Sequence, residues 1–424
     1  MSPTSPGFSF SFSHAAPQPR PDDEAPQGTL VLADLGGDRS QPLARRSALR
    51  IDIDRFDAVF ARIAPRLEAV GDGGQALAFG SIDDFRPEAL RSRVDHLVQA
   101  PATAAAGAPA ASSSAASDIE RLLGRAPSAP AEPTPLQAWL QGVVQPHLKP
   151  AAAPAATPRA TPALRALLHH PRFQALEATW RGVDALTRAV DFDETRSLWL
   201  LDATAEECAA DLDAHGSDLS ASALHRVLHA SGLPRWTLTV VDQAFGDAEL
   251  PRLAALGAIA ARAGAVLLAD AAPARLDTEG AAWQALRESP MAPHIGLLLP
   301  RVLMRLPYGP RTDPVSGLDF DELPPGAPPV GLLWGSAALA AARLAAGAEG
   351  DWPRLLDDLP ALVLDTADGE RRLHPATEWA LGDEAVRIAL ERGLMPWQAH
   401  RTRPLAQLAR WQSIAPGQDL RRPR

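Results

Sequence analysis

The chain has 424 residues, of which 46% are hydrophobic, so it can form about two or three domains with a sizeable buried core. It carries 51 Asp and Glu residues against 41 Lys and Arg residues, a formal net charge of -10. This acidic balance argues against a protein that binds nucleic acid or anionic membranes by general electrostatic attraction. Cys208 is the one cysteine, which excludes a disulfide or a cysteine metal cluster within one chain.

The N-terminal residues 1–27 are rich in proline and serine, and we predict a mobile tail that contains one donated strand. Phe8, Phe10 and Phe12 alternate with other residues, so a strand here places all three rings on one face. Such a strand needs a sheet edge, in its own chain or in a neighbouring one. A disordered tail with a chance alternation is the alternative.

No membrane or export signal is predicted. The N-terminus lacks both a basic region and a continuous apolar segment, which argues against a signal peptide. No uninterrupted apolar run reaches the length of about 18 residues that a membrane-spanning helix requires. We therefore expect a cytoplasmic protein without membrane insertion.

Residues 28–98 predict a small α/β module. The expected elements are a strand at 29–35, a helix at 54–67, a short strand at 76–79 and a second helix at 83–98. An Ala/Pro-rich stretch follows at 99–160. Its composition is typical of a flexible linker, and it contains two short predicted helices.

A larger α/β domain is predicted for residues 161–413, followed by a C-terminal tail at 414–424. Its alternation of strands and helices favours a central mixed or largely parallel sheet flanked by helices, so the fold class is mixed α/β. We predict strands at 197–201, 236–241, 265–269 and 361–364. We predict helices at 170–182, 205–214, 221–231, 251–263 and 332–344.

The helix at 170–182 begins at a proline and carries a stripe of apolar side chains. Phe173, Leu176 and Trp180 fall near one face at helical spacing. Such stripes pack into a core far more often than they bind a ligand. We therefore expect Phe173 and Trp180 to anchor the core.

Two features of the sequence could form a chemical site: a histidine pair and the single cysteine. His225 and His229 have the i, i+4 spacing of a zinc pair, but no third ligand is evident nearby, so a structural pair is favoured. Cys208 has acidic neighbours, which favour an inert, protonated thiol. We predict no catalytic, cofactor-binding or metal-binding residues.

The segment 170–182, His-Pro-Arg-Phe-Gln-Ala-Leu-Glu-Ala-Thr-Trp-Arg-Gly, closely resembles a signature of the large contractile-sheath subunit of type VI secretion systems, the TssC-like family. Further segments resemble that family in the same order, at 236–246, 253–265, 299–309, 333–339 and 392–396. The resemblance implies a structural role in assembly for Arg301, Arg305, Tyr308 and Trp334. Arg301 and Arg305 are expected on a short helix, paired with Asp313, Asp319 or Asp321.

The N-terminal module resembles the small sheath subunit, the TssB-like family. The resemblance rests on residues 30–35, 51–59 and 83–90. Two departures accompany it. The chain stops about where the large subunit is expected to continue into its inter-subunit strands, and Ala/Pro tracts replace most of the helical arm of that subunit.

These resemblances imply a non-enzymatic sheath component that acts by protein–protein assembly. The implied partners are other sheath subunits, further copies of the chain and, as possibilities, inner tube or baseplate proteins. A non-polymerising accessory or regulatory relative is the nearest alternative. An α/β enzyme with an unrecognised site is the alternative from a different class.

Overall fold

The computed structural model describes residues 7–12, 26–67, 76–91, 93, 160–230, 233–277, 279–324, 329–346, 348, 351–365 and 370–421. The predicted linker helices lie outside these residues, as do the ends of the predicted N-terminal tail. In the part of the chain described, no helix combines the length and apolar character needed to cross a membrane.

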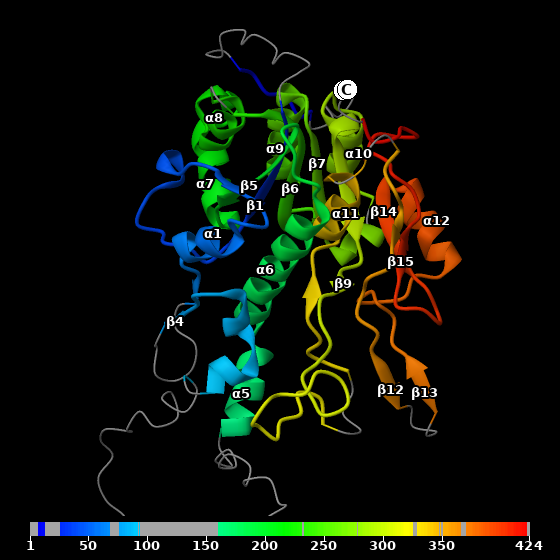
Figure 1. The fold of residues 1–424 in the computed structure, drawn as a ribbon. Helices are drawn as coiled ribbons and strands as arrows, with labels where there is room; N and C mark the ends of the chain where they lie inside the picture. Colours follow the sequence, from blue (N-terminus) through cyan, green and yellow to red (C-terminus); the bar gives the residue numbers. More distant parts are fainter. Residues whose placement is uncertain are drawn as a thin grey trace, which may run out of the picture.

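A nine-stranded mixed sheet forms the centre of the protein (Figure 1). Its strand order is β11-β15-β14-β8-β7-β6-β1-β5-β2. In that order the strands span Leu355–Leu356, Ala406–Leu408, Leu394–Ala399, Ile295–Leu299, Val266–Ala271, Arg235–Phe245, Gln27–Ala33, Arg196–Asp202 and Leu49–Ile51. The strands from β14 to β5 are parallel, whereas β2, β15 and β11 pair antiparallel. The predicted mixed α/β class is confirmed.

Strand β1 lies inside this sheet, between β6 and β5. Leu30 and Leu32 pack into the core on one side of the sheet, while Val31 and Ala33 pack into the core on the other. A strand that is apolar on both faces needs cover on both, which an interior position provides. Strands β1 and β2 of the predicted small module therefore belong to the large sheet and not to a sheet of their own.

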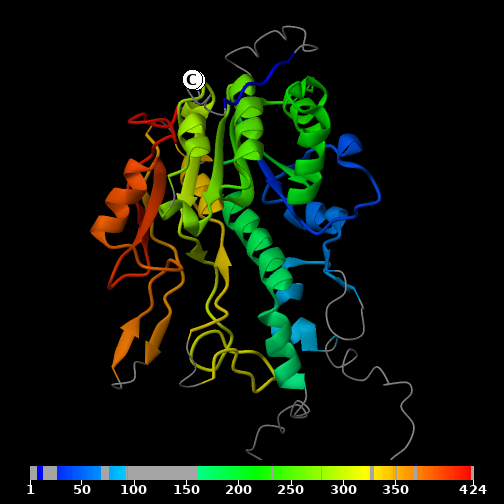
Figure 2. The same cartoon turned by 180° about the vertical axis from the view of Figure 1, so that it is seen from behind.

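Helices cover both faces of the sheet (Figures 1 and 2). One layer holds α1 (Phe56–Ile63), α6 (Pro171–Ala189) and α11 (Ala337–Ala346), and α5 (Ala160–Leu168) continues it beyond the sheet. The opposite layer holds α7 (Ala205–His215), α8 (Ala223–His229), α9 (Leu250–Ala263), α10 (Ala281–Arg287) and α12 (Asp383–Glu391). This arrangement buries both faces of the parallel strands.

Shorter elements join these layers. Three two-stranded pairs are β3 (Arg66–Leu67) with β4 (Leu77–Ala78), β9 (Val302–Leu303) with β10 (Trp334–Gly335), and β12 (Val363–Asp365) with β13 (Arg371–Leu373). The 3-10 helices are η1 (Leu43–Arg45), η2 (Ile82–Phe85), η4 (Leu219–Ala221), η5 (Pro273–Leu276) and η6 (Ala292–His294).

Several predicted boundaries are corrected. Helix α1 ends at Ile63, short of the predicted 67, because Ala64 adopts a left-handed conformation (φ 53°) directly before Pro65. The predicted strand at 361–364 overlaps β12, which pairs with β13 outside the main sheet. The predicted helix at 332–344 begins only at Ala337, since Trp334–Gly335 forms β10.

Candidate assembly and structural site

Helix α6 joins the N-terminal residues to the large domain through aromatic packing. Trp180 is fully buried, its ring centroid lies 4.3 Å from that of Phe60, and its indole N–H donates to the carbonyl of Leu35 at 3.1 Å. Phe173, also fully buried, meets the ring of Phe85 at 5.7 Å. Both predicted anchors lie in the core, where they contact residues from the first 91 positions of the chain.

A buried charged network lies beside this aromatic cluster. Arg305 donates from Nε to Oε1 of Glu177 at 2.8 Å and from Nη1 to Oε2 of Glu322 at 2.7 Å. The exposed fractions of the three side chains are 7%, 0% and 1% in that order. The backbone N–H of Tyr308 donates to Glu322 at 2.8 Å, and Arg181 donates to the Tyr308 hydroxyl oxygen at 3.1 Å.

The charged state of this network follows from its pairing. Burial acts to raise the pKa of Glu322, but the imidazole of His169, whose Nε2 lies 3.7 Å from Glu322 Oε1, and the charge of Arg305 outweigh it, so the pKa is lowered. Burial raises the pKa of Tyr308 to about 12, which keeps the phenol neutral. The network is therefore an ionised Arg between two carboxylates, capped by a neutral phenol.

The structure corrects the predicted partners of Arg305. Residues 302–303 form β9 and not a helix, and Arg305 pairs with Glu177 and Glu322. Asp313 pairs instead with Arg86 of the N-terminal part, at 3.2 Å. The pairing of Arg305 with Glu177 could not be predicted from local sequence spacing, because Glu177 lies 128 positions before Arg305.

Arg301 and Trp334 lie apart from the charged network. Arg301 is half exposed and pairs with Glu378 at 2.6 Å, also correcting the predicted pairing with nearby aspartates. Trp334 belongs to β10, and its ring centroid lies 6.0 Å from that of His374. Both residues line a cavity at the carboxyl ends of the parallel strands.

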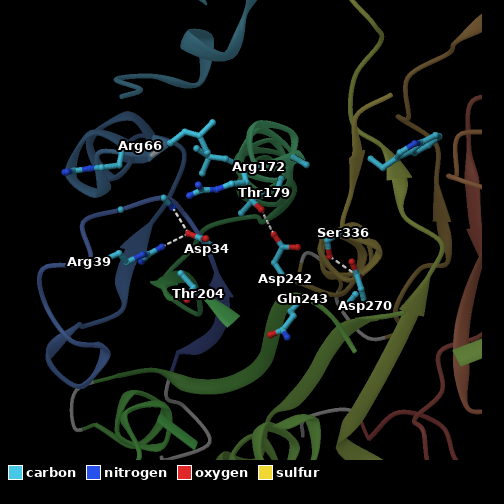
Figure 3. Close-up of a pocket in the computed structure, with 18 of the residues that line it drawn as sticks. Asp34, Arg39, Arg66, Arg172, Thr179, Thr204, Asp242, Gln243, Asp270 and Ser336 are labelled. Atoms are coloured by element: carbon cyan, nitrogen blue, oxygen red, sulfur yellow. Dashed lines mark hydrogen bonds and ion pairs between the residues drawn. The ribbon is translucent and has the colours of Figure 1, made fainter. Parts of the chain in front are cut away.

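This cavity of about 690 Å³ lies beneath α6, at the ends of β1, β6 and β7 (Figure 3). Several of its polar side chains pair with one another or with residues beside the cavity. Arg39 forms ion pairs with Asp34 and Asp202, and the Thr179 hydroxyl donates to Asp242 at 2.5 Å. The pairing within the wall favours a cavity that clamps neighbouring elements together over one that binds a ligand.

Asp242, which lies in the family-like segment 236–246, and Asp270, which no sequence motif marked, are structural residues in the wall of this cavity. Asp270 accepts from the Ser336 hydroxyl at 3.1 Å and from the backbone N–H of Ala338 at 2.7 Å, which caps α11. Burial and then the charge of Asp242 raise the pKa of Asp270 to about 8, and burial also raises the pKa of Asp242. Each residue lies near the carboxyl end of a buried parallel strand. An acidic residue at that place in an otherwise apolar segment is a pattern that can be recognised in the sequence.

The Asp270→Asn variant is expected to flatten the dependence of stability on pH. The folded pKa of Asp270, about 8, lies above its ordinary value, so the unfolded chain loses this proton first as pH rises. Stability is therefore lost between about pH 4 and pH 8, by on the order of 3 kcal/mol from pH 5 to pH 8. Urea unfolding at several pH values measures it, with the exposed Asp193→Asn as control. Parallel profiles for wild type and Asp270→Asn would contradict the assignment.

Residues 7–12 pack against their own chain. Phe8, Phe10 and Phe12 are half-buried against one core cluster, with Phe12 next to α8 and α9, while the intervening residues are exposed, so burial alternates along the segment. The segment joins no sheet. It makes one parallel bridge, in which Ser11 N–H donates to Ser217 at 2.7 Å and Leu219 N–H donates to Ser11 at 3.1 Å.

His225 and His229 form a stacked pair with ring centroids 4.0 Å apart. Across the described residues there is no cluster of three or more His, Cys, Asp or Glu side chains placed to hold a metal ion. Cys208 is buried in α7, and burial raises the pKa of its thiol to about 12. His225 and Cys208 are thus buried core residues, and His229 is a partly buried neighbour of His225.

Comparison with known proteins matches two family models to this chain. A family model described as VipB (EvpB/VC_A0108, tail sheath N-terminal domain) matches residues 159–281 and 270–415. A second, described as T6SS_VipA (Type VI secretion system, VipA, VC_A0107 or Hcp2), matches residues 11–100.

Two curated relatives come from Pseudomonas aeruginosa. The type VI secretion system sheath protein TssC1 is 28% identical over 276 residues, which covers 54% of this chain and 54% of the relative. The sheath protein TssB1 is 38% identical over 78 residues, 16% of this chain and 45% of the relative. The chain spans about half the length of the curated relatives it matches. Since the VipB match covers more than half of the chain, the protein belongs to the VipB tail sheath family of type VI secretion systems, with a TssB-like part preceding the TssC-like part in one polypeptide.

Proposed function

We propose that this protein is a structural component of a type VI secretion sheath, which acts by protein–protein assembly and catalyses no reaction. The position of β1 is the observation that carries the proposal. This strand of the TssB-like part pairs in parallel with β5 over Gln27–Ala33 and with β6 on its other side. The two sheath parts thus fold as one unit with a fixed one-to-one ratio, as an assembly protomer requires.

The proposed division is a TssB-like part at 28–98 and a TssC-like part at 161–413. Other sheath subunits and further copies of this chain are the proposed partners, with inner tube and baseplate proteins as further candidates. Phe8, Phe10 and Phe12 are proposed to link protomers when they leave their own chain, since a segment with a single backbone bridge and three half-buried rings can make the same contacts on a neighbouring copy. An enzyme is less favoured, because several polar groups of the cavity at the strand ends pair with each other.

Deleting residues 1–14 is expected to leave the fold intact but to abolish self-association and co-purification with sheath subunits. The described part of this segment, residues 7–12, contributes no strand to the central sheet and packs on its outside, so its loss should leave the sheet intact. Circular dichroism checks the fold, and affinity purification with the tagged chain checks the partners. A Ser9→Ala variant, altered at an exposed position of the same segment, serves as control. Unchanged association of the deletion variant would contradict the linking role.

A further inference from the structure

The contacts of Phe12 go beyond apolar packing. Its ring centroid lies 5.2 Å from that of His225 on α8, and the guanidinium carbon of Arg262 on α9 lies 4.7 Å from the same centroid. His225 in turn stacks on His229 at 4.0 Å. One aromatic side chain of the N-terminal segment therefore contacts an imidazole, which is itself stacked on a second one, and a cation.

His225 is poorly placed to carry a charge. Its side chain is only 4% exposed, and its Nε2 is buried without a hydrogen-bond partner among the described residues. A protonated ring here would lie in an apolar site beside His229 and the cation Arg262. The carboxylate of Asp218 acts in the opposite direction, but it lies in the loop that bridges to Ser11. The docked arrangement thus favours neutral imidazoles.

We propose that His225 and His229 form a proton-operated latch, which holds residues 7–12 on α8 and α9 while both imidazoles are neutral and releases them on mild acidification. Opening removes Phe12 from the imidazole and admits water to Nε2. The protonated rings then become hydrated, while Arg262 loses its contact with Phe12. This behaviour concerns the chain alone and does not depend on the proposed sheath function.

The pKa shifts of His225 and His229 set how strongly docking of residues 7–12 depends on pH. Burial, together with His229 and Arg262, lowers the pKa of His225 to about 4, and burial lowers the pKa of His229 as well. A folded pKa below the ordinary value of about 6.5 means that the released state binds the proton first. Docking is therefore complete above about pH 6.5 and weakens as pH falls, by about thirtyfold at pH 5 if release restores the ordinary pKa of His225.

A nitroxide label at Ser9→Cys in the full chain tests the latch. Ser9 is exposed, and the native Cys208 is buried with a thiol pKa raised to about 12, so the label attaches at position 9. Electron paramagnetic resonance is expected to show an immobilised label at pH 8 and a mobile one at pH 5. Circular dichroism over the same range monitors whether the domain remains folded.

Matched variants separate the latch from general acid sensitivity. His225→Phe with His229→Phe retains rings for stacking but cannot gain protons, so the label should stay immobilised at pH 5. His215→Phe, at the end of α7, should leave the transition unchanged, and Phe12→Ala should mobilise the label even at pH 8. A label that is mobile at pH 8 in the parent, or a transition that persists in the double variant, would overturn the proposal. So would the absence of any transition in the parent.

Discussion

Replacing Arg305 with alanine is expected to destabilise the protein by about 3–5 kcal/mol. The substitution leaves the carboxylates of Glu177 and Glu322 without the cation that both contact, and these side chains are 0% and 1% exposed. Without the charge of Arg305, burial raises the pKa of Glu322, so this carboxyl gains a proton more readily. The loss of unfolding free energy in Arg305→Ala should therefore be larger at pH 8 than at pH 5, where protonation of the carboxylate removes part of the penalty for burying an unpaired charge. Urea unfolding at both pH values measures it.

Arg301→Ala is the matched control for that experiment. Arg301 also pairs with a glutamate, Glu378, but its side chain is 50% exposed, so its loss should cost less than about 1 kcal/mol. Adding Glu177→Gln and Glu322→Gln to Arg305→Ala should recover part of the stability and remove the pH dependence of the deficit. Equal costs for the two arginine variants would show that burial of the charged network is not what stabilises this region.

The Trp180→Ala variant is expected to lose about 3–5 kcal/mol, because the indole is fully buried and its truncation leaves a cavity in the core. The loss should spread to the N-terminal part of the chain, since Trp180 contacts Phe56 and Phe60 of α1 and donates to Leu35 beyond β1. Hydrogen exchange should accordingly speed up in β1 and α1 as well as in α6.

Trp334→Ala serves as the control for Trp180→Ala. Trp334 is partly exposed and lines the cavity at the strand ends, so its truncation should cost roughly half as much or less. Its exchange effects should stay near β9 and β10. A Trp180→Ala protein with an unchanged unfolding midpoint would contradict the assignment of this side chain to the core.

The sequence predicts central strands and helices correctly where an apolar pattern is long enough to fit only a strand or only a helix. The apolar run of β6 and the stripe of α6 are long enough to identify each element. Strand β8 was missed because a short continuous apolar run such as Ile295–Leu299 has no helical or strand periodicity. The short elements β9 and β10 were misassigned because tertiary pairing between them decides their conformation.

The site was predicted only in part, for a physical reason. Phe173 and Trp180 lie on one helix, so local spacing reveals their common face. The partners of Arg305 come from segments 128 and 17 positions away, and no local pattern encodes that contact. The interior position of β1 could not be predicted from local sequence either, because the order of strands in a sheet follows from long-range packing and not from the pattern within one strand.

Electron microscopy of the purified full-length chain, alone and mixed with the sheath subunits of the same system, tests the central claim most directly. We expect ordered tubular or ring-shaped assemblies, in which each protomer contains β1 between β5 and β6 of the same chain. A chain that remains monomeric at high concentration and enters no assembly of the other subunits would contradict the proposed structural role in the sheath.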